Sequence, residues 1–150
     1  CELEMDITPN NADTVGFALL NDKGEKVDIY LDLKGGRIVM DRTQSGITDL
    51  SRYGEVTVHA KETDDHRKKL SVNYVNDFAL GTWAPLSLCN GKTYHLDVFV
   101  DKCSIEIFVD GGRIAMTNLV FPTAPYSALR FYSKDGEAQI KNLNIYQLSL

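Results

Sequence analysis

Apolar and polar residues alternate with a period of two along most of this 150-residue chain. From Val27 to Leu33 every odd position is aliphatic, and every even position is charged or aromatic. Successive side chains of a β-strand point to opposite faces of the sheet, so this pattern predicts a strand with one buried face. Lys34-Gly35-Gly36 follows, and Arg37–Asp41 then supplies another strand-like run. Because paired glycines tolerate the positive φ angles of tight turns, we predict a β-hairpin here.

The most regular alternation lies between Leu96 and Val109. Aliphatic side chains occupy every second position on either side of Lys102-Cys103, which we interpret as a two-residue turn. In this register the aliphatic residues meet on one face, whereas a slip of one residue would place them opposite charges. The predicted pairs are Val100–Ile105 and Val98–Ile107 on the core face, and Phe99–Glu106 and Asp97–Phe108 on the outer face.

Similar short runs recur along the rest of the chain, separated by turns rich in Gly and Asn. They lie at 15–20, 55–60, 70–75, 128–132 and 139–148, and no convincing apolar helical stripe interrupts them. We therefore predict an all-β fold, a two-sheet antiparallel β-sandwich of the concanavalin or lectin-like jelly-roll type, with residues 1–150 as a single domain. A closed barrel is the main alternative.

Composition narrows the classes of function. The net charge is −5 and the only dense basic stretch, at 66–69, directly follows two aspartates, so we predict no nucleic-acid partner. No apolar run approaches the roughly 20 residues that span a bilayer, so we predict no membrane partner. The three cysteines and three histidines lack the tight spacing of a zinc site, and we predict no metal or cofactor. A Cys89–Cys103 disulfide stays open as an alternative.

The run from Leu96 to Gly112 reads as a strand ending in Phe-Val-Asp, a polar turn, Ser-Ile-Glu-Ile-Phe and a Gly turn. It resembles the characteristic hairpin of the C-terminal domain of glycoside hydrolase family 32, which includes levanases, inulinases and invertases. Met40-Asp41-Arg42 with Ser45-Gly46 resembles the family's D-R-x-x-S-G segment. The segments 116–122 and 142–148 resemble its following and closing strands. Relative to the family, Glu55–Val75 is additional and is predicted to form an extra hairpin.

The resemblance implies that the catalytic residues lie outside this chain. Family members are retaining glycosidases, whose two carboxyl groups sit on an N-terminal five-bladed propeller within N-D-P-N-G and E-C motifs. Neither motif, nor the stabilising R-D-P, occurs here. We therefore expect a non-catalytic fragment of a larger enzyme that lacks the propeller. Asp101 and Glu106 are weighed as a separate catalytic pair, but Glu106 and Arg42 are better interpreted as structural hydrogen-bonding residues.

The expected role is to stabilise and dock onto the propeller of the same parent chain. Large apolar groups on an outward face often mark an interface, and on that ground Phe99, Phe108 and Tyr30 are predicted to form the docking face. The alternative function is a lectin-like module that binds fructan or another polysaccharide, with Trp83 and Tyr74 as candidate sugar contacts. A homodimer through sheet edges is also conceivable. The resemblance implies a secreted, periplasmic or cell-surface location.

Overall fold

The computed structural model describes residues 1–49, 56–61, 67–72 and 78–147, and every regular element in these ranges is a β-strand. The strands are β1 (Glu2–Pro9), β2 (Thr14–Leu20), β3 (Lys26–Asp32), β4 (Arg37–Asp41), β5 (Val56–Lys61), β6 (Arg67–Val72), β7 (Gly81–Pro85), β8 (Tyr94–Val100), β9 (Ser104–Val109), β10 (Ile114–Leu119), β11 (Ala128–Lys134) and β12 (Ala138–Tyr146). Within the described ranges, no helix has the length and apolar content needed to cross a bilayer.

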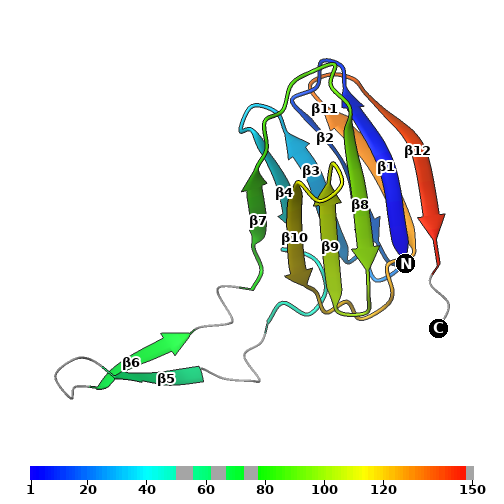
Figure 1. Cartoon of the computed structure of the whole chain (residues 1–150). Coiled ribbons are helices and arrows are strands. Elements are labelled where there is room, and N and C mark those ends of the chain that lie inside the picture. Colours follow the sequence, from blue (N-terminus) through cyan, green and yellow to red (C-terminus); the bar gives the residue numbers. More distant parts are fainter. Residues whose placement is uncertain (50–55, 62–66, 73–77, 148–150) are drawn as a thin grey trace.

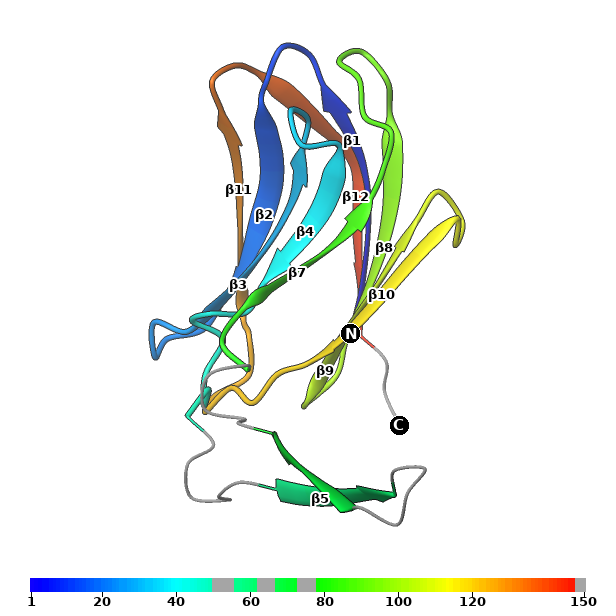
Figure 2. The same ribbon diagram turned by 90° about the vertical axis from the view of Figure 1, so that its left-hand side faces the viewer.

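Ten strands form two antiparallel sheets of five, stacked as a sandwich (Figures 1 and 2). Sheet A has the order β10-β9-β8-β1-β12, and sheet B has the order β11-β2-β3-β4-β7. The predicted two-sheet antiparallel fold is confirmed, and the barrel alternative is wrong. Strands β5 and β6 pair with each other over 56–61 and 67–72, as the predicted extra hairpin requires, while residues 55, 62–66 and 73–75 of that prediction lie outside the described residues.

The predicted register of the central hairpin is confirmed pair by pair. Val98 lies opposite Ile107 and Val100 opposite Ile105, and the turn between them consists of Lys102 and Cys103. Val98, Ile105 and Ile107 are completely buried. The hairpin at Gly35-Gly36 is confirmed as well, since β3 and β4 pair antiparallel on either side of it.

The core is a single apolar cluster between the two sheets. Sheet A contributes the inward rows of β1, β8 and β9, and sheet B contributes those of β2, β3 and β4. Tyr94 is fully buried in this cluster, where its hydroxyl accepts a hydrogen bond from the Cys89 amide at 2.8 Å. Burying an aliphatic or aromatic side chain of this size contributes about 1.5–3 kcal/mol each, so these rows hold the sheets together.

Polar contacts join the sheets where β4 and β7 approach β10. Asn118 on β10 donates from its amide nitrogen to Thr82 Oγ1 on β7 at 2.7 Å. Arg42, directly after β4, donates from Nη1 to the Leu119 carbonyl at 2.9 Å, and its guanidinium lies 4.2 Å from the centre of the Phe78 ring. The predicted inter-sheet hydrogen bonding of Arg42 is therefore confirmed.

The segment after Arg42 packs tightly against the chain that follows β10. The buried Ser45 donates from Oγ to the Arg42 carbonyl at 2.7 Å, and the Ser45 carbonyl accepts from the Tyr126 hydroxyl. Gly46 has φ of +147°, and a Cβ there would lie 2.3 Å from the Phe121 carbonyl oxygen. Only glycine meets both conditions, so glycine at position 46 is a packing requirement.

We predict that Gly46→Ala lowers the free energy of unfolding by more than Gly24→Ala. Both glycines have positive φ, but a Cβ at Gly24 meets nothing within 4 Å, so the second substitution isolates the backbone cost. That cost is about 1–2 kcal/mol in the left-handed region of Gly24. Gly46, with φ of +147°, lies where residues other than glycine are rarer still, and the clash with Phe121 adds to its cost. Urea denaturation of the three proteins measures the difference. Equal losses would show that the close approach to Phe121 is unimportant.

Candidate functional site

The residues predicted as one docking face lie on two different sheets. Phe99 on β8 and Phe108 on β9 point outward from sheet A, whereas Tyr30 on β3 points outward from sheet B. The outer faces of the two sheets point in opposite directions, so the three side chains do not share a surface. Including Tyr30 was wrong because alternation shows which side of a strand is buried but not which sheet the strand joins.

Phe99 and Phe108 do form a pair. Their ring centres are 5.7 Å apart and their planes make an angle of 81°, an edge-to-face arrangement that aromatic rings favour. Both rings are half-buried. Their cross-strand partners are acidic: Phe99 lies between Glu2 and Glu106, and Phe108 lies opposite Asp97. The result is an apolar patch with a carboxylate border, which we call the Phe99/Phe108 patch.

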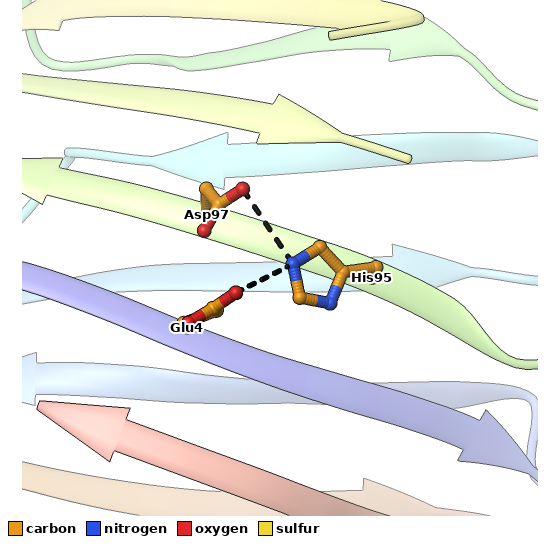
Figure 3. A group of neighbouring side chains, drawn as sticks. All are labelled: Glu4, His95 and Asp97. Atoms are coloured by element: carbon orange, nitrogen blue, oxygen red, sulfur yellow. Dashed lines mark ion pairs between the residues drawn. The ribbon is translucent and has the colours of Figure 1, made fainter. Parts of the chain in front are cut away.

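A histidine surrounded by carboxylates lies on the same face as this patch, and Figure 3 shows its contacts with Glu4 and Asp97. His95 Nε2 is 3.2 Å from Glu4 Oε1 and 3.5 Å from Asp97 Oδ2, and His95 Nδ1 is 2.7 Å from Asp6 Oδ1. The second oxygen of Asp6 accepts a hydrogen bond from Asn142 on β12 at 2.7 Å. Three neighbouring strands thus contribute to one network on the outer face of sheet A.

These contacts shift the titration of two members in opposite directions. The hydrogen bond with Asp6 raises the pKa of His95 above its ordinary value of 6.5, helped by the nearby charges of Asp97, Asp6 and Glu4 and opposed by partial burial. Hydrogen bonds from Asn142 and His95 lower the pKa of Asp6. The protonated imidazole is therefore the form that the folded protein stabilises.

The same group has the geometry of a metal-ligand set. Single ligand atoms of Glu4, His95 and Asp97 all lie within 4.8 Å of one another, and imidazole nitrogen and carboxylate oxygen are ligands that Zn²⁺ accepts. Both nitrogens of the ring already contact carboxylates, however, so an ion would have to replace these contacts. We assign the cluster an electrostatic role.

Local sequence pattern contains little signal for this cluster. Alternation placed His95 and Asp97 together on an outer face, but Glu4 and Asp6 lie about ninety positions earlier on the neighbouring β1. Only the pairing of the first strand with β8 brings them together. A prediction of that pairing would have revealed the network, because all four residues occupy outward positions.

The other predicted candidates are separate from this face. Trp83 is 58% exposed on the outward side of β7, with the Arg37 guanidinium 5.5 Å from its ring centre, while Tyr74 lies outside the described residues. Cys89 and Cys103 are both free and exposed, so the alternative disulfide is wrong.

The two carboxylates weighed as a catalytic pair lie on the outer face of sheet A and at its β8–β9 turn. Asp101 is exposed next to the β8–β9 turn, and Glu106 lies on the outer face of sheet A between its partners Phe99 and Thr117. A general acid of a retaining glycosidase needs a shielded pocket that keeps its carboxyl protonated. The exposed position of Asp101 does not provide one.

The His95 network predicts a specific pH dependence of stability. Because the folded protein raises the pKa of His95, the contribution of the charged ring is complete below about pH 6.5 and is lost as the pH rises through the folded-state value. Wild-type protein should therefore lose more thermal stability than His95→Gln between pH 6 and 8.5. A partly exposed ion pair contributes under about 1 kcal/mol, so the extra loss is about 2 °C. Parallel melting curves of both proteins would contradict this.

Comparison with known proteins identifies the family. The family model described as the C-terminal domain of glycosyl hydrolases family 32 matches residues 1–147. A levanase of Bacillus sp. (strain L7) is 26% identical over 148 residues, covering 98% of this chain and 13% of that enzyme. A levanase of Bacillus subtilis (strain 168) is 25% identical over 145 residues, covering 97% of this chain and 18% of that enzyme. The chain thus spans less than a fifth of either levanase.

Solved structures agree on the fold. The crystal structure of exo-inulinase from Aspergillus awamori superimposes with a TM-score of 0.62 at 22% identity, over 97% of this chain and 25% of that one. The family match extends over the central hairpin, the Asp-Arg segment and the strands on either side. With its full-length match and its sandwich of two five-stranded sheets, this chain belongs to the family of glycosyl hydrolase family 32 C-terminal domains.

Proposed function

We propose that this chain is the non-catalytic accessory domain of a fructan-cleaving enzyme of the levanase or inulinase type, and that it packs against the enzyme's catalytic propeller. The proposal is carried by the positions of the residues that match the family's characteristic segments. The aliphatic residues of the β8–β9 hairpin are in the core, and Arg42, Ser45 and Gly46 join the two sheets. These residues build a scaffold and do not converge on a reaction site.

The Phe99/Phe108 patch is the surface that we assign to docking. It combines two half-buried aromatic rings with the acidic neighbours Glu2, Glu106 and Asp97. Large aromatic side chains dominate the energetics of protein interfaces, and the border of carboxylates favours a partner with basic residues around an apolar hollow. Because levan and inulin are polysaccharides too large for ready uptake, the proposal also places the enzyme outside the cytoplasm.

The first prediction of the proposal concerns activity. The purified chain should release no fructose from levan, inulin or sucrose above the level of a blank, because a retaining glycosidase needs two carboxyl groups across one cleft. Reducing-sugar assays with all three substrates measure this. Hydrolysis that disappears in Glu106→Gln or Asp101→Asn would show that the chain is itself an enzyme.

The second prediction concerns docking. Capture of the chain by the separately produced propeller of its enzyme should fall about tenfold in Phe99→Ser, since an apolar side chain buried at an interface contributes about 1.5–3 kcal/mol. The free variant should remain folded and lose only the edge-to-face contact, worth about 1 kcal/mol. Trp83→Ser is the matched control, because it removes an exposed aromatic ring from the opposite sheet.

Two results would count against the docking assignment. One is unfolding of isolated Phe99→Ser, which would make Phe99 a core residue. The other is equal capture of Phe99→Ser and the wild type, or selective loss in Trp83→Ser, which would move the interface away from sheet A.

A further inference from the structure

The outward face of sheet B is hollowed along β2. Gly16 and Ala18 are the outward residues in the middle of this strand, and both are buried although they point away from the core. Larger residues of β3, β4 and β11 cover both positions, and together with Thr14 of β2 they line a groove of about 640 Å³. A Cβ on Gly16 would lie 2.3 Å from the Ile29 carbonyl oxygen, so no larger residue fits there without moving the backbone.

An aromatic and apolar row crosses this face. Successive cross-strand partners, from β11 to β7, are Tyr132, Gly16, Tyr30, Val39 and Trp83. With neighbouring strands about 4.8 Å apart, the row extends about 19 Å, which is much longer than a single sugar ring. Val39 is only 6% exposed between Tyr30 and Trp83, whereas Trp83 is 58% exposed. An outward face that only met water would not need such a row.

Charged groups border the row on both sides. Asp28 and Asp41 are cross-strand partners on one side, and Lys26 Nζ lies 3.1 Å from Asp28 Oδ2. On the other side Asp32 Oδ2 accepts from Arg37 Nε at 2.9 Å. Each carboxylate has about four acceptor positions, so these contacts leave oxygens able to accept further hydrogen bonds. Burial and the nearby Asp28 raise the pKa of Tyr132, which keeps its hydroxyl a neutral donor and acceptor.

The charges of the groove cancel. Its charged lining residues are three acids, Asp28, Asp32 and Asp41, and three bases, Lys26, Arg130 and Lys134. An anion would meet three carboxylates, and a cation would meet three basic groups. A neutral molecule with many hydroxyl groups can donate to the carboxylates and accept from the bases at the same time, while its apolar faces lie on aromatic rings.

We propose that this groove is a binding site for a neutral oligosaccharide. The chemical class follows from the groove, and the choice of fructans as the first probe rests on the proposed function. A sugar explains the groove better than a protein partner does, because the buried centres of protein interfaces are depleted of charged residues and six of the groove's lining residues are charged.

Calorimetric titration of the chain tests this proposal. The probes are levan-type and inulin-type oligosaccharides, with a cello-oligosaccharide as a neutral sugar of another kind. We expect saturable binding of at least one of the three. Asp41→Asn should weaken it about tenfold, since a hydrogen bond to a charged group contributes about 1.5–3 kcal/mol. Asn can still accept from the Thr43 amide, as Asp41 Oδ1 does at 2.9 Å, so the fold should persist.

Two control variants lie on other surfaces, and one further variant changes the groove. Asp101→Asn makes the same change at an exposed turn and should bind like the wild type. Arg130→Gln alters a second, exposed lining residue and should also weaken binding. Trp83 is the only tryptophan, so its fluorescence should change with the same affinity if the ligand extends along the row to β7. Tyr146→Ala, on β12 of sheet A, should leave that change intact.

Two outcomes would overturn the proposal. One is that none of the three sugars binds saturably at millimolar concentration, and the other is that Asp41→Asn and Asp101→Asn bind with equal affinity. If no sugar binds, the propeller-capture experiment is repeated with the groove variants, and a loss of capture would count as a further result against the sugar site. Loss of propeller capture in the groove variants would make the groove a protein interface. A chain that binds no sugar but still docks through the Phe99/Phe108 patch leaves the proposed function intact, and a chain that binds sugar without docking leaves the groove assignment intact.

Discussion

The burial of two facing sets of apolar rows is the constraint on which the rest of this domain depends. Phe17 and Ile29 from sheet B and Ile107 from sheet A are fully removed from water, and each contributes about 1.5–3 kcal/mol. Since side chains alternate, a shift of one residue in any central strand would expose its whole apolar set. The inner faces are therefore committed to packing. Binding functions are left to the outer faces, the edges and the ends of the sandwich.

Buried polar residues also belong to this scaffold. Arg42 and Asn118 donate across the gap between the sheets, and Ser45 donates to the backbone beside it. The buried Nε of Arg42 has no hydrogen-bond partner within the described residues, and burial lowers the pKa of this guanidinium. These costs are tolerated because the residues fix how the end of β4 meets β10. In this chain Arg42, Ser45 and Gly46 therefore serve the packing of the two sheets.

The parts of the fold that follow from local pattern could be predicted, and the parts that depend on strand order could not. The register of β8 and β9 followed from a two-residue turn and the alternation around it. The sheet to which Tyr30 belongs could not be predicted, because no local signal shows which sheet a strand joins. The His95 network escaped notice for the same reason, since its acidic members come from the first strand. Gly16 and Ala18 looked like ordinary strand residues until both neighbouring strands were in place.

The two outer faces differ enough in chemistry to serve different partners. The outward positions of β1, β8 and β9 in sheet A carry five carboxylates, those of Glu2, Glu4, Asp6, Asp97 and Glu106, around two phenylalanines and one histidine. Sheet B instead balances acids with bases along a row of aromatic rings. Because the faces point away from each other across the core, a protein domain covering one leaves the other open. One small sandwich can therefore be fixed to an enzyme by one sheet and present its groove to a polysaccharide with the other.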